Sequence, residues 1–98
     1  MAIFIVRVEL KKLKTHDHPS YTKLHEKMAE AGFSRTIEAS DGRVYALPPA
    51  MYTYTSALTA EDVHNKAKYA ANAVDTDNAV VASQTVYSWW SGLNIVSK

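Results

Sequence analysis

The sequence predicts an α+β fold in which six elements follow the order strand, helix, strand, strand, helix, strand. Residues 3–10 alternate with the period of two that is typical of a strand. Residues 20–33 and 59–74 each carry a stripe of apolar side chains at helical spacing. A strong hairpin signal, Asp41-Gly42, lies between the two helices. At 98 residues, the chain is expected to form one domain spanning 1–98.

The first strand and the first helix each have a clear apolar side. In residues 3–10 the apolar face is Phe4, Val6, Val8 and Leu10, and the other face is Ile3, Ile5, Arg7 and Glu9. A polar, basic loop ending at Pro19 follows. Ser20 is the expected N-cap of the first helix, and its buried stripe is Tyr21, Leu24, Met28 and Ala31. Gly32 fits the left-handed position after the last turn.

The middle of the chain reads as two strands joined by a hairpin. Residues 33–40 form the first, and residues 43–47 begin its partner after the Asp41-Gly42 turn. Pro48 and Pro49 indicate a bulge or the end of pairing. Residues 50–56 continue extended, because β-branched and aromatic side chains dominate there.

The second helix has the clearest start in the sequence. Thr59 and Asp62 form a pair resembling a capping box, and Leu58 and Val63 take the staple positions around it. The stripe that follows is made of small residues: Val63, Ala67, Ala70, Ala71 and Val74. Small side chains let a helix pack closely on a sheet. Residues 79–90 form the last predicted strand, which ends before Gly92.

Two strand–helix–strand units with right-handed crossovers build a four-stranded antiparallel sheet with both helices on one face. This is the ferredoxin-like βαββαβ fold. The other face of the sheet is uncovered in a monomer. We therefore expect a binding surface, or the contact of a homodimer, on that face.

Composition excludes several classes of protein. The chain has no cysteine, so it has no disulfide framework, no thiolate zinc site and no cysteine nucleophile, and it fits a reducing cytoplasm. Arg7 and Glu9 interrupt the apolar N-terminal run, so neither a signal peptide nor a membrane span is expected. A net charge of +1 is too small for a protein that grips duplex nucleic acid. The absence of a Gly-rich loop argues against a small-molecule cofactor.

Histidines gather between residues 16 and 25. His16, Asp17, His18 and His25 have residue types that bind metals, and three of them would be needed to hold an ion. A connecting loop that leads into a helix explains the same residues more simply. We therefore predict no metal site, and we keep these histidines as candidates for acid–base chemistry.

A mixed basic and aromatic surface is expected on the uncovered face. Its members are Arg7, Arg35, Arg43, Tyr45, Tyr52, Tyr54 and Trp89. Such a surface can stack on single-stranded bases, each stack contributing about 1–3 kcal/mol. The same aromatics could instead pack across strand pairs, or be covered by a partner subunit. A standard RNA recognition motif is not expected, because Phe4 has the parity of the core and residues 42–50 do not match the second signature of that family.

Four segments resemble one protein family. They are VRVEL at 6–10, LHEKMAEAGFSRTI at 24–37, DGRVYALPPAMYTY at 41–54 and WSGL at 90–93. The likeness covers residues 3–93 and is to the GhoS-like family, which contains the endoribonuclease antitoxin of type V toxin–antitoxin systems and uncharacterised relatives. The resemblance implies a ferredoxin-like fold and cleavage of single-stranded mRNA.

Cleavage of RNA without a metal needs a base, a cation for the phosphorane charge and an acid. The candidates for the base are Glu9, His16, His18 and His25, and the candidate cations are Arg7 and Arg35. The alternative function is a non-enzymatic module that binds another protein in regulation or in phage–host conflict.

Overall fold

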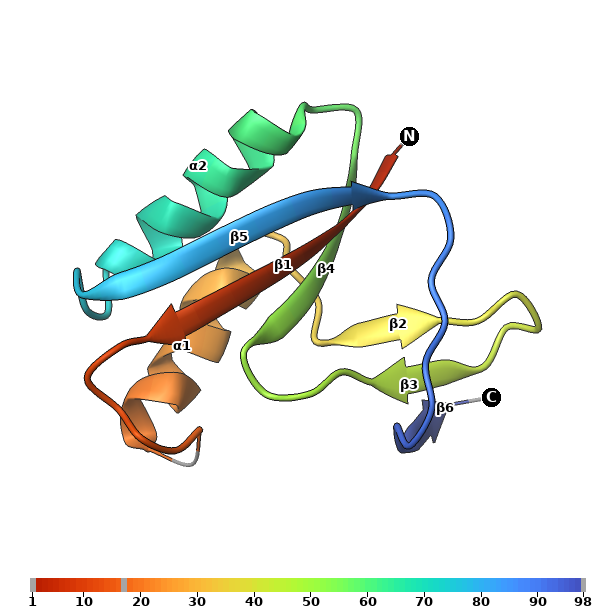
Figure 1. Ribbon diagram of the computed structural model, residues 1–98, viewed down its shortest axis with the longest axis horizontal. Coiled ribbons are helices and arrows are strands. Elements are labelled where there is room, and N and C mark those ends of the chain that lie inside the picture. The colour runs from red at the N-terminus through yellow and green to blue at the C-terminus, as the bar shows by residue number, and fades with distance from the viewer. Residues whose placement is uncertain (1, 17, 98) are drawn as a thin grey trace.

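The computed structural model describes residues 2–16 and 18–97, which fold into two helices and six strands (Figure 1). In chain order the elements are β1 (Ala2–Leu10), α1 (Pro19–Glu30), β2 (Thr36–Glu38), β3 (Val44–Ala46), β4 (Met51–Ser56), α2 (Ala60–Asn72), β5 (Asn78–Thr85) and β6 (Ile95–Ser97). The predicted α+β class is confirmed. Neither of these helices combines the length and the apolar run that a bilayer crossing requires.

The strands form two antiparallel sheets of three strands each. In the first sheet β1 is central, between β4 and β5. In the second sheet β3 is central, between β2 and β6. The sheets meet where Ser34, just before β2, exchanges backbone hydrogen bonds of 2.9 and 2.8 Å with Thr53 of β4. In Figure 1 the first sheet runs diagonally, and the second lies to its lower right.

The core lies between the first sheet and the two helices. It contains Phe4, Val6, Val8 and Leu10 from β1, Tyr21, Leu24 and Met28 from α1, and Val63, Ala67, Ala70 and Ala71 from α2. Arg7, on the opposite face of β1, is exposed. The predicted alternation of the first strand is therefore confirmed, and both helix stripes pack on the predicted side.

The single four-stranded sheet is not confirmed, because residues 43–56 do not form one strand. Proline cannot donate to a strand ladder, and Pro48 and Pro49 stop the pairing. Ala50 then takes a left-handed φ of 72°, which turns the chain. As a result β3 and β4 belong to different sheets, and β2 turns away from β4 after the Ser34 bridge. It pairs with β3 across the predicted turn, where Gly42 has a φ of 87°.

The predicted starts and ends of the helices and strands are partly confirmed. Thr59 caps α2 as predicted, its hydroxyl accepting from the Asp62 N–H at 3.2 Å. The cap of α1 is His18 rather than Ser20, because Pro19 occupies the first helical position, where no N–H is needed. The last long strand ends at Thr85 rather than at residue 90, and β6 carried no sequence signal.

Candidate functional site

The carboxylate of Glu9, near the end of β1, joins three other side chains. Its Oε1 accepts hydrogen bonds from Arg7 Nη2 at 2.8 Å and Arg7 Nε at 3.1 Å. Its Oε2 lies 3.1 Å from His16 Nε2 and accepts a 3.2 Å hydrogen bond from the Tyr21 hydroxyl. That hydroxyl accepts from the backbone N–H of Leu10 at 2.9 Å. These contacts fix the carboxylate between the exposed face of β1 and α1.

The same contacts keep Glu9 ionised. Burial alone would raise the pKa of Glu9, but hydrogen bonds from His16, Arg7 and Tyr21 outweigh it and hold the pKa below its usual value. A carboxylate only accepts, so His16 must carry a hydrogen on Nε2 to bond with it. In neutral His16 the Nδ1 lone pair is then free. An imidazole oriented in this way is suited to act as a general base.

A second histidine lies further along α1. His25 Nδ1 is 2.7 Å from the hydroxyl of Tyr52 on β4. Burial raises the pKa of Tyr52, so the phenol keeps its proton. A buried hydroxyl needs an acceptor, and donation to Nδ1 supplies one. Burial, together with the nearby charges of Arg35 and His16, lowers the pKa of His25. His25 is therefore neutral at neutral pH, with its hydrogen on Nε2.

The rings of these residues form a continuous row from the loop before α1 to β4. The ring centroids are 4.9 Å apart for His16 and Tyr21, 6.5 Å for Tyr21 and His25, and 5.8 Å for His25 and Tyr52. We call the set Arg7, Glu9, His16, Tyr21, His25 and Tyr52 the histidine cluster. It brings together three of the four predicted base candidates and places both predicted cations beside them.

The fourth base candidate lies outside the histidine cluster. His18 is exposed, and its Nδ1 accepts from the Ser20 N–H at 3.1 Å as the cap of α1. Asp17, which sequence analysis considered as a metal ligand, falls outside the described residues. Within residues 2–16 and 18–97, no three His, Asp or Glu side chains are placed to hold a metal ion.

Three of the predicted RNA-binding residues lie away from the open face. Tyr52 is fully buried, so its ring has no surface for a base. Tyr54 points to the same side of β4 as Tyr52. Its ring stacks on Phe33, with the ring centroids 4.6 Å apart, and the Lys66 ammonium lies over it. The cause is the register of β4, which pairs Tyr52 with Val6 and Tyr54 with Phe4, both core residues. Arg43 is at the β2–β3 turn, 3.6 Å from Asp41.

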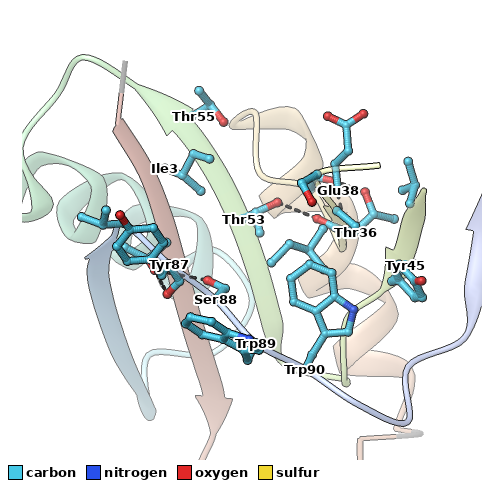
Figure 2. A pocket seen from close by; sticks show the side chains of 17 residues that line it. Ile3, Thr36, Glu38, Tyr45, Thr53, Thr55, Tyr87, Ser88, Trp89 and Trp90 are labelled. Atoms are coloured by element: carbon cyan, nitrogen blue, oxygen red, sulfur yellow. Dashed lines mark hydrogen bonds between the residues drawn. The ribbon is translucent and has the colours of Figure 1, made fainter. Parts of the chain in front are cut away.

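The other two predicted aromatics, Tyr45 and Trp89, line a groove on the opposite face, between the two sheets. This aromatic groove has a volume of about 830 Å³ and includes Ile3, Tyr45, Tyr87, Trp89 and Trp90. Trp90 meets Tyr45 edge to face at 5.6 Å, and Tyr87 lies 6.3 Å from Trp89. Figure 2 shows Tyr87, Trp89 and Trp90 along the segment that crosses in front of β1 and β4. Trp89 is 89% exposed.

A second hollow adjoins the aromatic groove, and none of the described residues that line it belongs to the histidine cluster. It has a volume of about 280 Å³ and shares Trp89 and Trp90 with the groove. Its floor includes Ile5 and Met51, and Met51 is paired across the sheet with Arg7. The exposed face of β1 thus leads from Ile3 in the groove, past Ile5, to Arg7 and Glu9.

Sequence reasoning missed two parts of this site. In a strand over residues 79–90, Tyr87 and Trp89 share a face and could be exposed together, but Trp90 has the opposite parity and was not placed on the predicted surface. The run Tyr87-Ser88-Trp89-Trp90 was the available signal, since exposed aromatics are unusual at the end of a strand. Tyr21 was expected only as a core residue, and nothing local predicts its bond to Glu9.

Comparison of the chain with protein-family models, with curated proteins and with solved structures found no match.

Proposed function

We propose that this protein binds single-stranded RNA and cleaves it as an endoribonuclease of the GhoS-like type, using its own side chains for acid–base chemistry. The observation that carries the proposal is the contact of Glu9 with His16, which orients an imidazole on an accessible edge of the molecule. Arg7 bonds to Glu9 of this pair, and the charge of Arg35 acts on His25. An mRNA substrate would place the protein in the cytoplasm, in agreement with a sequence that lacks cysteine.

The strand order also supports the family proposal. The first sheet has the order β5-β1-β4, and the Ser34 bridge places the start of the β2 segment next to β4. A ferredoxin-like sheet has this order. In this protein the second strand would keep one bridge to that sheet and direct its other hydrogen bonds to β3, forming a variant of the fold.

In the proposed reaction the ribose 2′-hydroxyl attacks the adjacent phosphorus, and His16 Nδ1 takes the hydroxyl proton. The bond from phosphorus to the 5′-oxygen breaks, and the 5′-oxygen takes a proton from water. The products are a 2′,3′-cyclic phosphate and a 5′-hydroxyl. Arg7 and Arg35 stabilise the charge that develops on the phosphorane oxygens. His25 contributes a neutral N–H donor at Nε2.

The test is a cleavage assay with an unstructured RNA oligonucleotide in the presence of a chelator. The proposal predicts cleavage with cyclic phosphate ends, and no cleavage of the matching 2′-deoxy oligonucleotide, which lacks the nucleophile. A general base contributes about 10²–10⁴-fold to a rate, so His16→Ala should reduce cleavage by at least about 100-fold. Glu9→Gln should also reduce it, because an amide can present its N–H to His16 and leave the imidazole in the wrong tautomer.

His18→Ala is the matched control, because His18 lies in the same loop but outside the histidine cluster. It should cleave at the wild-type rate. Arg7→Ala and Arg35→Ala should weaken RNA binding and reduce its dependence on salt, as expected for lost phosphate contacts. An intact RNA substrate, or equal rates for His16→Ala and the wild type, would refute the nuclease proposal.

The second candidate function is a protein-interaction module, and one observation favours it. The edge strand β5 contains no charged residue or proline to discourage pairing, and its Val81 is 61% exposed. A second copy or another protein bound there would shield this surface. Sedimentation of the purified protein over a range of concentrations tests for a homodimer.

A further inference from the structure

We propose that the aromatic groove is a nucleobase subsite, which holds single-stranded RNA upstream or downstream of the bond that the histidine cluster cleaves. The inference rests on the proposed function and adds to it the part of the protein that grips the substrate. It is carried by the chemistry of the groove and by the face of β1 that leads from it to the cluster.

The lining of the groove suits an uncharged, flat, polar ligand. Two rings at its mouth are free to stack, because Tyr87 is 79% and Trp89 is 89% exposed. Its wall is rich in hydroxyl groups, among them Thr36, Thr53 and Ser88. Each can accept from the edge of a base, although Thr53 has no hydrogen left to donate because its hydroxyl donates to the Thr36 carbonyl. A nucleobase combines a stacking face with a hydrogen-bonding edge.

Charge places the phosphates outside the groove. Among residues 2–16 and 18–97, Glu38 is the only charged residue that lines the groove, and a carboxylate repels phosphate. The second hollow is lined by both Trp89 and Met51, and Met51 is the cross-strand partner of Arg7, so Arg7 lies next to this hollow. A strand with its bases in the groove would therefore meet its first cation at the histidine cluster.

The separation fits a short single strand. Ile3 in the groove and Glu9 in the cluster lie on one face of β1, six residues apart. At about 3.3 Å per residue, this is roughly 20 Å, the length of a few extended nucleotides. Bases inside a duplex are stacked on one another and cannot reach Tyr87 or Trp89, so the groove selects single strands.

The experiment measures binding of a 2′-deoxy oligonucleotide, which the proposed reaction cannot cleave, by quenching of tryptophan fluorescence. Trp89 and Trp90 are the two tryptophans of the chain, so a Trp90→Phe background reports on Trp89 alone. The oligonucleotide should quench this emission. Trp89→Ala, read by fluorescence anisotropy of a labelled oligonucleotide, should weaken binding by at least about tenfold, and so should Tyr87→Ala.

Tyr69→Ala is the matched control, since Tyr69 is an 82% exposed aromatic on α2 and lies outside the groove. It should bind as the wild type does. Equal binding by Trp89→Ala, Tyr87→Ala and the wild type would overturn the proposal. Quenching by a soluble oligosaccharide but not by the oligonucleotide would also overturn it, and so would a homodimer that Trp89→Ala dissociates.

The two proposals fail in different ways. The His16→Ala variant should bind the oligonucleotide normally, because the groove does not include His16. Groove-dependent binding without cleavage by the wild type would refute the nuclease and leave the subsite. Cleavage by the wild type with unchanged binding in the groove variants would refute the subsite alone.

Discussion

Replacing Tyr52 by Phe tests the central contact of the histidine cluster. The ring of Tyr52 is fully buried, and its hydroxyl is 2.7 Å from His25 Nδ1. Phenylalanine keeps the ring and its packing, so the substitution removes one hydrogen bond and little else. A hydrogen bond contributes a net 0.5–1.5 kcal/mol, roughly, to the free energy of unfolding.

We expect a loss of about 1 kcal/mol for Tyr52→Phe, because the half-buried His25 can replace the lost hydroxyl with water. For a domain of this size, 1 kcal/mol lowers the Tm by roughly 4–8 °C. Thermal and urea denaturation followed by circular dichroism measure the change. Tyr45→Phe is the control, because Tyr45 is held by its ring against Trp90. Its change should stay within about 0.5 kcal/mol.

The titration of His25, followed by NMR, gives a second and independent result. A hydroxyl that donates to Nδ1 stabilises the neutral imidazole, so Tyr52→Phe should raise the pKa of His25. A fall in that pKa would mean that His25 donates to Tyr52, and the tautomer assigned here would be wrong. Unchanged stability together with an unchanged pKa would mean that the contact does not form in solution.

Three further predictions concern stability. Gly32→Ala and Gly42→Ala both place a side chain at a positive φ, which costs about 1–2 kcal/mol. Of these two substitutions, Gly32→Ala alone would put the new Cβ close to a tyrosine ring, 3.0 Å from Tyr54. Urea melts should therefore show a larger loss of stability for Gly32→Ala than for Gly42→Ala. Because the pKa of folded His25 lies below 6.5, the unfolded chain binds more protons and the free energy of unfolding falls as the pH drops below that value. His25→Gln should lose less stability than the wild type over the same range of pH in urea melts. Thr59→Ala should cost about 1 kcal/mol by removing the cap of α2, and a serine at the same position should restore it.

Short-range patterns in the sequence predicted most of the elements. The alternation of residues 3–10 placed Val6 and Val8 in the core and Arg7 in solvent, because successive side chains of a strand point to opposite faces. Thr59 and Gly42 were found for the same kind of reason, since a cap and a tight turn depend on a few adjacent residues. Pro48 and Pro49 were noticed, but the division into two sheets depends on which distant strand then pairs with each half.

The candidate site was predicted as a set of residue types rather than as an arrangement. The segment at residues 50–56 alternates tyrosine with threonine, so the sequence does not decide which face is buried. The register with β1 places Tyr52 and Tyr54 on the core side of the sheet and not on the open face. Trp89 was placed on the exposed surface correctly. Trp90, which has the opposite parity in a strand, lies in the same groove because the chain leaves the sheet after Thr85.

The sequence by itself determined the α+β class, the positions of both helices, the buried sides of the first strand and of the helices, and the presence of Arg7, Glu9 and several histidines around the end of the first strand. Tertiary structure alone decided that Glu9 meets His16 and Tyr21, that His25 meets Tyr52, and that a groove opens between two sheets. The physical reason is the distance along the chain over which each kind of interaction acts. Periodicity and capping act over one or two turns of chain, whereas a contact between side chains 27 residues apart depends on the register and packing of the whole domain.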